Sequence, residues 1–491
     1  MYKRILIFAL CVLFGPAVAV AGIQYYVRPN GGDDGICDGR VNVPDPGTGG
    51  MPRACAFQTP AYAVTQIAPG DDIQLATGTY THFDVAAGLN ASDSDPTVIA
   101  GDPTVDRTQI IINGTGYQEA IYSAGGNPPT NPKTRNVTVR HLSFRPGTIC
   151  NGSRGCTGIN FGGQNEGLIF EDLEVGTSLL TGLSPREAGA TSAAVIKVGE
   201  GTYQSNNITI RDSRFVGASD TCLYGICGVN ANMFFTFADA VKVHNVVASY
   251  FHGAFLLEAR HNTVVEYCTI TDATCDAHEG CVGSYNDLNY VVRRNVFGRV
   301  RGSVQHPVIK VRRTNSTTPA ANVLAYNNTF IAMGDVINYD EIIMGWTPRW
   351  FGSSFESGNS VFLNNIVMNA ANALYDSYAV QMDHCADPNS SIHVDHNNWW
   401  NNDAGRNFGT HVTPPCAGTY NANSLVNDPQ LGAGGVSYAP PIENPACTAG
   451  TTSFVAPDGD VSSVYIGAKP CGGSGQGGGD PGCRPVCYDA P

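Results

Sequence analysis

A pair of short strand-like segments recurs along residues 136–400, and this repeat restricts the fold more than any other feature of the chain. Each copy contains a short run in which apolar and polar residues alternate, a turn that is often marked by Asn, and a second short run. Successive copies begin 21 to 40 residues apart, as expected for a solenoid whose rungs carry loops of different lengths. The copies are NVTVRHLSF at 136, GLIFEDLEV at 167, NITIRDSRF at 207, VKVHNVVAS at 241, NTVVEYCTI at 262, NYVVRRNVF at 289, NVLAYNNTF at 322, NSVFLNNIV at 359 and SIHVDHNNW at 391.

A single rung of this kind cannot bury its own apolar side, so the rungs must stack and share one core. Charged residues make up only 14% of the chain, which suits stacked short strands and turns better than helices. Asn tolerates left-handed backbone angles at a bend, and stacked amides can hydrogen-bond along a column. We therefore expect a structural ladder formed by Asn295, Asn328, Asn365 and Asn397.

The N-terminal part of the chain contains a characteristic order of elements. YYVRPNGGDDG begins at Tyr25, and FQTPAYAVTQIAPGDDIQLATGTYTHFDV begins at Phe57. These stretches predict an extended strand, a Gly/Asp turn, a short helix at 59–68 and a strand that ends in Gly-Thr-Tyr. This order resembles the N-terminal cap of secreted right-handed parallel β-helix proteins of the pectate-lyase-like superfamily. The resemblance implies an all-β, right-handed parallel β-helix with a capping helix, a fold mostly used on long acidic polysaccharides.

The first 21 residues have the pattern of a secretory signal. Lys3 and Arg4 precede an apolar run, and small residues at 19–21 form a cleavage site. The apolar run is too short to span a bilayer. We expect a signal peptide at 1–21, one β-helix domain at 22–440 and a Cys/Gly/Pro-rich tail at 441–491. NSLVNDPQLGA, which begins at Asn423, resembles the segment that packs after the last rung of this superfamily. The protein is expected to be secreted, either extracellular or periplasmic.

The net charge of −14 bears on the possible partners. Nucleic-acid binding requires a basic surface, so a nucleic-acid partner is not expected. An acidic polysaccharide is compatible with this charge if the binding face carries a local basic patch. We further expect no membrane partner and a monomeric protein.

Cysteine usage agrees with export. Of the sixteen cysteines, Cys11 lies in the signal, and most of the others fall into close pairs. We expect each pair to staple one loop, although spacing does not fix connectivity. The pairs are Cys37 and Cys55, Cys150 and Cys156, Cys222 and Cys227, Cys275 and Cys281, Cys385 and Cys416, Cys447 and Cys471, and Cys483 and Cys487. Cys268 is left over and is expected to be a buried free thiol. No spacing indicates a zinc site.

Several strands that follow the same turn of their repeats carry polar residues at alternate positions, so we expect these residues to share one face. In GAFLLEARH, Leu257 and Ala259 are taken as the inward positions. The outward residues of the four main strands are then Lys197, Glu258, Arg260, Lys310, Arg312, Gln381 and Asp383. The intervening segments add Asp239, His278 and Glu279 to the same face. Lys197 and Lys310 are expected four rungs apart, roughly 19 Å, which suits an oligosaccharide.

This set of residues suits β-elimination of a uronate polymer, in which a weakly acidic proton beside a carboxylate is removed. A desolvated lysine flanked by cations has a lowered pKa, so Lys310 is the expected base and Arg312 its electrostatic partner. Arg260 and His278 complete the expected catalytic group. The expected substrate-binding residues are Lys197, Gln381 and Asp383. The expected ligands of a Ca²⁺ cofactor are Asp239, Glu258 and Glu279.

Two other classes of function remain open. A glycoside hydrolase on the same scaffold would use the three acids directly. A non-catalytic carbohydrate-binding or adhesive β-helix would carry outward charges that are only solvated or paired. A polygalacturonase is not favoured, because residues 219–222 are SDTC where that family carries paired aspartates.

Overall fold

The computed structural model describes most of the strand-forming chain. The described residues are 22–33, 35–125, 133–149, 157–175, 194–199, 205–216, 232–236, 238–252, 255–259, 261–274, 281–285, 289–301, 308–312, 322–332, 344–345, 360–369, 380–382, 391–402, 408–410, 417–420, 423–431, 438, 440, 443–452, 454–456, 458–463 and 465–468. The predicted signal at 1–21 and the last part of the predicted tail lie outside this set.

The strands form three long parallel sheets. The first sheet contains β1 (Gln24–Gly32), β2 (Asp72–Leu75), β5 (Thr97–Gly101), β8 (Thr134–Arg135), β9 (Val137–Arg145), β11 (Asn165–Val175), β13 (Ser205–Arg211), β16 (Ala238–His244), β19 (Thr263–Glu266), β22 (Asn289–Arg293), β25 (Asn322–Tyr326), β28 (Ser360–Leu363), β31 (Ser391–Asp395) and β34 (Ala417–Tyr420). The second contains β3 (Gly78–Thr81), β6 (Ile110–Asn113), β14 (Arg214–Val216), β17 (Val247–His252), β20 (Thr269–Thr274), β23 (Val296–Arg301), β26 (Thr329–Ala332), β29 (Ile366–Met368) and β32 (Asn398–Trp400). The third contains β4 (Phe83–Val85), β7 (Glu119–Ser123), β10 (Thr157–Phe161), β12 (Ala194–Val198), β15 (Asn232–Thr236), β18 (Leu256–Ala259), β21 (Val282–Tyr285), β24 (Ile309–Arg312), β27 (Met344–Gly345), β30 (Val380–Met382) and β33 (Phe408–Thr410).

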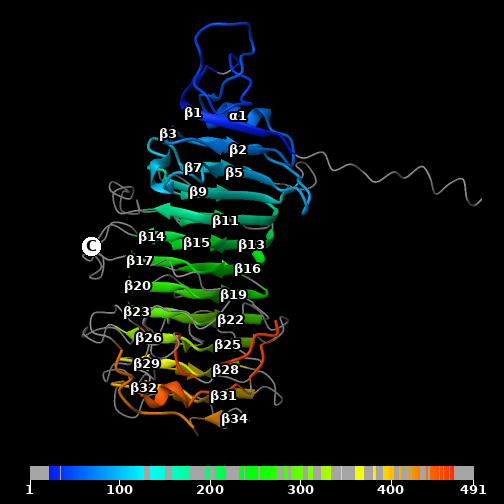
Figure 1. Cartoon of the computed structure of the whole chain (residues 1–491). Coiled ribbons are helices and arrows are strands. Elements are labelled where there is room, and N and C mark those ends of the chain that lie inside the picture. The colour runs from blue at the N-terminus through cyan, green and yellow to red at the C-terminus, as the bar shows by residue number, and fades with distance from the viewer. Residues whose placement is uncertain are drawn as a thin grey trace, which may run out of the picture.

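Consecutive strands of one rung belong to different sheets, and each strand pairs in parallel with its equivalent in the next rung. For example, β16 pairs with β19, β17 with β20 and β18 with β21. The long strands β9 and β11 pass through the corner between the first two sheets and join them. Figure 1 shows the resulting column of rungs. This topology is a parallel β-helix, which confirms the expected fold class.

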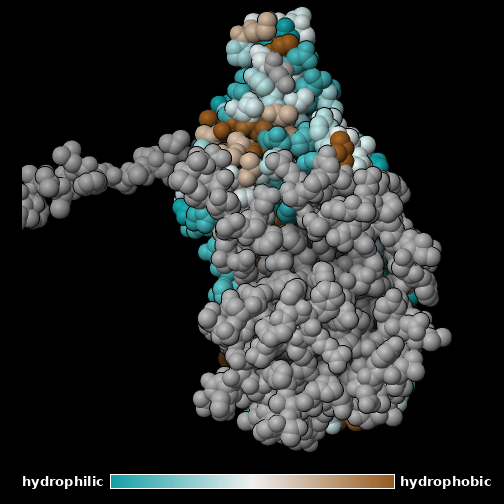
Figure 2. All heavy atoms as spheres, turned by 180° about the vertical axis from the view of Figure 1, so that it is seen from behind, coloured by the Kyte–Doolittle hydropathy of each residue, from teal (hydrophilic) through white to brown (hydrophobic). Residues whose placement is uncertain are grey.

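The predicted capping helix is present as α1 (Pro60–Gln66). Thr59 is its N-cap, and the Thr59 hydroxyl accepts a hydrogen bond from the backbone N–H of Tyr62. Ala63 and Val64 are buried in the main core at the N-terminal end of the solenoid (Figure 1). None of the described helices is long and apolar enough to cross a membrane. Figure 2 shows hydrophilic and hydrophobic residues interspersed on the described surface at this end.

The core runs along the solenoid axis between the three sheets. Aromatic rings of successive rungs stack along the axis: Phe297 and Phe330 are register partners in the second sheet, and the stack then continues through Phe362 of the first sheet to Trp399 of the second. The ring centroids of Phe297 and Phe330 are 4.9 Å apart, those of Phe330 and Phe362 are 5.9 Å apart, and those of Phe362 and Trp399 are 5.9 Å apart. This continuous stack is the shared core that the repeat predicts.

The asparagine ladder is also confirmed. Asn295, Asn328, Asn365 and Asn397 are fully buried. The Oδ1 atoms of Asn328, Asn365 and Asn397 each accept a hydrogen bond from the backbone N–H of the ladder residue in the preceding rung, at 2.8–3.0 Å. The expectation of left-handed angles needs a correction, because those angles belong to the residues one position earlier in the turn. They are Arg294, Asn327, Asn364 and His396, with φ values between 52° and 55°.

Cys268 occupies the position of the ladder just before Asn295, and its backbone N–H donates to Asn295 Oδ1 at 2.9 Å. The thiol is free and buried, as expected. Burial raises the pKa of this thiol to about 12. Cys268 therefore continues the ladder column as a small buried side chain.

Residues 443–468, which we call the C-terminal strap, pack against the outer side of the solenoid in their described parts. Figure 1 shows them in orange to red beside the later rungs. Phe454 and Ala456 cover an apolar stripe of the first sheet that includes Val291, Leu324 and Val361. This part of the predicted tail thus belongs to the packed structure.

Polar contacts fix the strap at the corner between the first two sheets. Asn327 Nδ2 donates to Tyr465 O, and Asn364 Nδ2 donates to Thr451 O, at 2.8 and 2.9 Å. The left-handed asparagines of two rungs therefore serve as docking points for the strap.

The expected pairing of Cys37 with Cys55 is confirmed. Cys281 and Cys447 are disulfide-bonded as well, with partners outside the described residues. The other expected pairs also lie outside them.

Candidate functional site

The outer side of the third sheet is the face on which the sequence places its candidate residues, and strand register defines it. On successive strands of this sheet, one residue per strand points into the core, and each of these register partners is at most 1% exposed. This inner column consists of Ile121, Ile159, Ile196, Phe234, Leu256, Val282 and Ile309. Because successive residues of a strand alternate between the two sides, the position after each of these belongs to the outer side.

The outer column changes character along the axis. Its N-terminal part consists of Asp84, Tyr122, Asn160, Lys197, Phe235 and Leu257, which are consecutive register partners. Its C-terminal part consists of Gly283, Lys310, Gly345, Gln381 and Gly409. Gly345 thus separates positions 310 and 381, and Gly283 and Gly409 flank them, so the rungs beside each position carry no side chain in this column.

Lys197 lies in the outer column, four rungs before Lys310 in the order of the sheet. It is on the outer side of its strand, as expected, but its exposed fraction is only 3%, so other residues cover it. The neighbouring column residue Asn160 is equally buried, and its Nδ2 donates to Glu119 Oε1 at 3.1 Å. Alternation alone identifies the outer side correctly here but gives no information on what covers that side.

The alternation assumed for GAFLLEARH also needs a correction. Leu256 is the fully buried core position, and Leu257 is the register partner of the outer position 235. The register then shifts between Leu256 and Ala259, because β18 contains an irregularity opposite β21. A β-bulge resets the alternation of the residues that follow it, so the side assigned to position 258 does not follow from sequence alternation.

Asp239 does not share the face of the third sheet. It lies in β16 of the first sheet, as the register partner of Asn206. Its Oδ1 accepts from the backbone N–H of His261 at 3.2 Å and lies 3.0 Å from His261 Nδ1. The expectation that Asp239 lies on the same strand face as Glu258 is therefore wrong, because β15 of the third sheet ends at Thr236 and Asp239 belongs to the next strand, β16, of the first sheet.

The remaining predicted residues are only partly described. Arg260, His278, Glu279 and Asp383 lie outside the described residues. For four others the structure gives the backbone position alone, and these are Glu258, Lys310, Arg312 and Gln381. Position 312 is the register partner of Tyr285. Their roles stay predictions.

The glycines of the outer column are not among the residues predicted from the sequence. Gly283 and Gly345 lie one rung before and one rung after Lys310. The available signal was a glycine at the outer position of a short strand, where a side chain would normally be tolerated. Without the register, these two glycines could not be aligned with Lys310.

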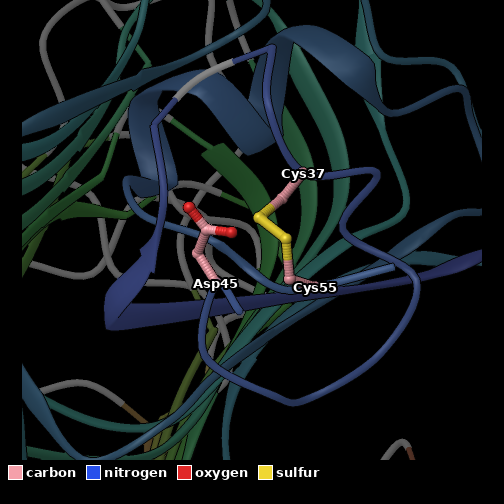
Figure 3. Close-up of side chains that lie close together, drawn as sticks. All are labelled: Cys37, Asp45 and Cys55. Carbon is pink, nitrogen blue, oxygen red and sulfur yellow. A yellow bond between two sulfur atoms is a disulfide. The ribbon is translucent and has the colours of Figure 1, made fainter. Parts of the chain in front are cut away.

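Among the described residues, the side chains of Cys37, Asp45 and Cys55 lie close enough together to suggest a metal site (Figure 3). The two sulfurs are joined in a disulfide and provide no thiolate ligands. Asp45 pairs with Arg53 at 2.8 Å, and hydrogen bonding to Arg53 and to the Gly47 N–H lowers the pKa of the Asp45 carboxyl. This group is a structural staple of the N-terminal loop.

No family model matches the chain, and no curated protein matches it. A rhamnogalacturonan lyase has a similar structure, with a TM-score of 0.43 and 11% identity over 91% of this chain and 96% of that chain. A PL6-family polysaccharide lyase from Pseudopedobacter saltans gives a TM-score of 0.42 and 11% identity over 76% and 91%. A GH136 lacto-N-biosidase from Eubacterium ramulus gives 0.35 and 11% over 82% and 68%. The fold assignment rests on the strand pairing of this chain itself.

Proposed function

We propose that this protein binds an acidic polysaccharide at position 310, on the outer side of the third sheet, and cleaves it there by β-elimination. The observation that supports this proposal is the column Gly283–Lys310–Gly345, in which a lysine position is flanked on both neighbouring rungs by residues without side chains. Neighbouring rungs lie about 4.8 Å apart, so a sugar ring beside the lysine would meet backbone and no side chain at position 345. Gly283, on the other side of the lysine, is itself buried.

The chemistry of elimination suits a lysine in such a position. The base removes the proton from the carbon beside the uronate carboxylate, the bond to the glycosidic oxygen on the next carbon breaks, and a carbon–carbon double bond forms. The leaving oxygen takes up a proton, and the substrate carboxylate must be neutralised while the proton leaves. Lys310 would be the base, and Arg312, in the same strand, would neutralise the carboxylate.

A calcium ion could neutralise the carboxylate instead, but the described residues do not assemble the expected ligands. Asp239 lies on the first sheet, and its Oδ1 is already engaged by His261. We therefore assign the neutralising role to arginine and derive no step through a metal.

The test follows the ultraviolet absorbance of the unsaturated product while the purified protein meets pectate, alginate, chondroitin and dermatan sulfates, and ulvan. We expect absorbance to rise with at least one polymer and to stay flat for Lys310→Ala. Lys133→Ala is the matched control, because Lys133 belongs to the first-sheet side and pairs with Glu166 at 3.7 Å.

The possible outcomes separate the classes of function. Flat absorbance accompanied by new reducing ends would replace the lyase with a glycoside hydrolase. Binding of a polymer without either signal would leave a carbohydrate-binding protein. A rise in absorbance that survives Lys310→Ala would remove Lys310 from the role of base.

A further inference from the structure

We propose a second sugar-binding position at the corner between the second and third sheets near the N-terminal end, with Tyr117 as its stacking surface. The sugar it takes is uncharged and rich in hydroxyl groups. This inference extends the proposed function, because the position lies on the same outer side as Lys310, but its own test does not depend on cleavage.

The Tyr117 ring is held by a fixed partner. His82 lies between β3 and β4, and Tyr117 lies at the equivalent corner of the next rung, between β6 and β7. The two rings stack with centroids 4.6 Å apart and an interplanar angle of 18°. His82 Nδ1 lies 2.9 Å from Glu119 O, and His82 Nε2 lies 2.9 Å from Asp84 Oδ1. Contacts at both ring nitrogens fix the orientation of His82 and, through stacking, that of Tyr117.

Tyr117 is also open to solvent. It is 44% exposed and is the one aromatic residue among the large exposed apolar side chains of the described chain. Ile149 of the following rung is 42% exposed, and its backbone N–H donates to Tyr117 O at 2.9 Å. A rigid, exposed aromatic ring with an apolar neighbour provides contact area at low entropic cost, as sugar-binding sites require.

The carboxylate that contacts His82, the ring stacked on Tyr117, indicates which sugar fits. Asp84 begins the outer column of the third sheet, and 68% of its side chain is exposed. Its carboxylate can accept hydrogen bonds from sugar hydroxyls, whereas it would repel the carboxylate of a uronate. An uncharged sugar is therefore favoured at this position.

The order of strands in the third sheet gives the distance between Tyr117 and the proposed cleavage site. The third sheet runs from β7 through β10, β12, β15, β18 and β21 to β24, which is six rungs and roughly 29 Å. The outer column between them is covered at Asn160 and Lys197, so Tyr117 and Lys310 are separate contact positions. Short oligosaccharides could contact only one of them.

The test measures the dissociation constant by calorimetry for polygalacturonate, which contains only uronates, and for unsulfated chondroitin, in which uronates alternate with a neutral sugar. We expect Tyr117→Ala to raise the dissociation constant for unsulfated chondroitin by about 3- to 10-fold and to change that for polygalacturonate less, and we expect Tyr117→Phe to bind like the wild type. Tyr26→Ala is the control, because Tyr26 lies on the first sheet at the same end. We also expect Asp84→Asn to strengthen the binding of polygalacturonate at low salt.

Each of the other possible results supports or overturns the second sugar-binding position. A dissociation constant for Tyr117→Ala within twofold of the wild type would overturn the second position, and an intact cleavage signal would then leave the proposed function standing. Weaker binding by Tyr117→Ala in a protein that cleaves nothing would keep the sugar position and remove the lyase. If the wild type does not bind unsulfated chondroitin, the second position is overturned.

Discussion

Asn295 and Asn328 lie on consecutive rungs, and the backbone N–H of Asn295 donates to Asn328 Oδ1 at 3.0 Å. Asn328 Nδ2 in turn donates to Val292 O at 2.8 Å. Each ladder residue thus satisfies backbone groups of the preceding rung in a buried environment, where an unpaired donor or acceptor is costly.

Replacing one ladder residue should therefore destabilise the solenoid. We expect Asn328→Ala to lower the free energy of unfolding by about 2–4 kcal/mol, because it leaves two backbone groups without partners. Urea unfolding followed by circular dichroism measures the change. Asn206→Ala, at an exposed position of β13, should cost little. Equal stability of the two variants would argue against an energetic role for the ladder.

The ion network under the strap predicts acid sensitivity. Glu266 is 3% exposed, and this burial raises the pKa of its carboxyl. Hydrogen bonds from His244 and Lys242 and the charge of Arg293 outweigh burial, so the pKa of the Glu266 carboxyl lies well below its usual range. A carboxyl whose pKa is lowered on folding adds stability above its unfolded value of about 4.3, and that stability is lost as the pH falls below this value.

We therefore expect Glu266→Gln to lower stability at neutral pH by about 3–5 kcal/mol, because the charges around it lose their partner. The variant should also lose less stability than the wild type as the pH falls below about 4.3. Thermal unfolding across this pH range measures both effects. Glu443→Gln, at an exposed position, serves as the control. Parallel pH profiles for wild type and Glu266→Gln would contradict the assignment.

The strap should loosen when its charged anchor is removed. Arg294 Nη1 donates to Asp460 Oδ1 at 2.9 Å, and Nη2 donates to Val461 O at 3.1 Å. We expect Arg294→Ala to speed hydrogen exchange at 458–463 at least tenfold, a loss of about 1.4 kcal/mol of local stability. Arg299→Ala, whose side chain is 65% exposed in the wild type, should leave exchange there unchanged. Unchanged protection in Arg294→Ala would mean that apolar packing alone holds the strap.

The thiol of Cys268 should be inert in the folded protein. It is buried, and burial raises its pKa to about 12, so almost no reactive thiolate forms at neutral or mildly alkaline pH. We expect mass spectrometry to find the Cys268 peptide unmodified after treatment with iodoacetamide at pH 8, and fully modified after denaturation. Modification of the native protein would show that the ladder opens at this rung.

The glycines beside position 310 give a direct test of the proposed groove. We expect Gly345→Val to raise the dissociation constant for the bound polymer at least tenfold, because a side chain would fill the space next to Lys310. Gly50→Val is the control, because a Cβ at Gly50 meets nothing within 4 Å. Unchanged binding in a folded Gly345→Val variant would place the polymer elsewhere.

The fold and its ladder could be predicted because stacking forces the same residue type onto equivalent positions. The Asn residues that recur at the turns predict a column of stacked amides, and Thr59 followed by Pro60 is typical of the start of a helix. The candidate site was harder to predict. The burial of Lys197 depends on what covers its strand, the register at Glu258 depends on a bulge, and the corner before Asp239 moves that residue to another sheet. None of these is encoded in local alternation.

The strap joins parts of the chain that are far apart in sequence. Arg294 and Asp460 are 166 residues apart, so their contact forms only after the intervening rungs have stacked. Until then the apolar stripe at Val291, Leu324 and Val361 has no cover. Because long-range contacts form late in folding, the rungs should assemble first and the strap should close last. A chain that ends before residue 443 would therefore leave this apolar stripe exposed to solvent and be prone to self-association.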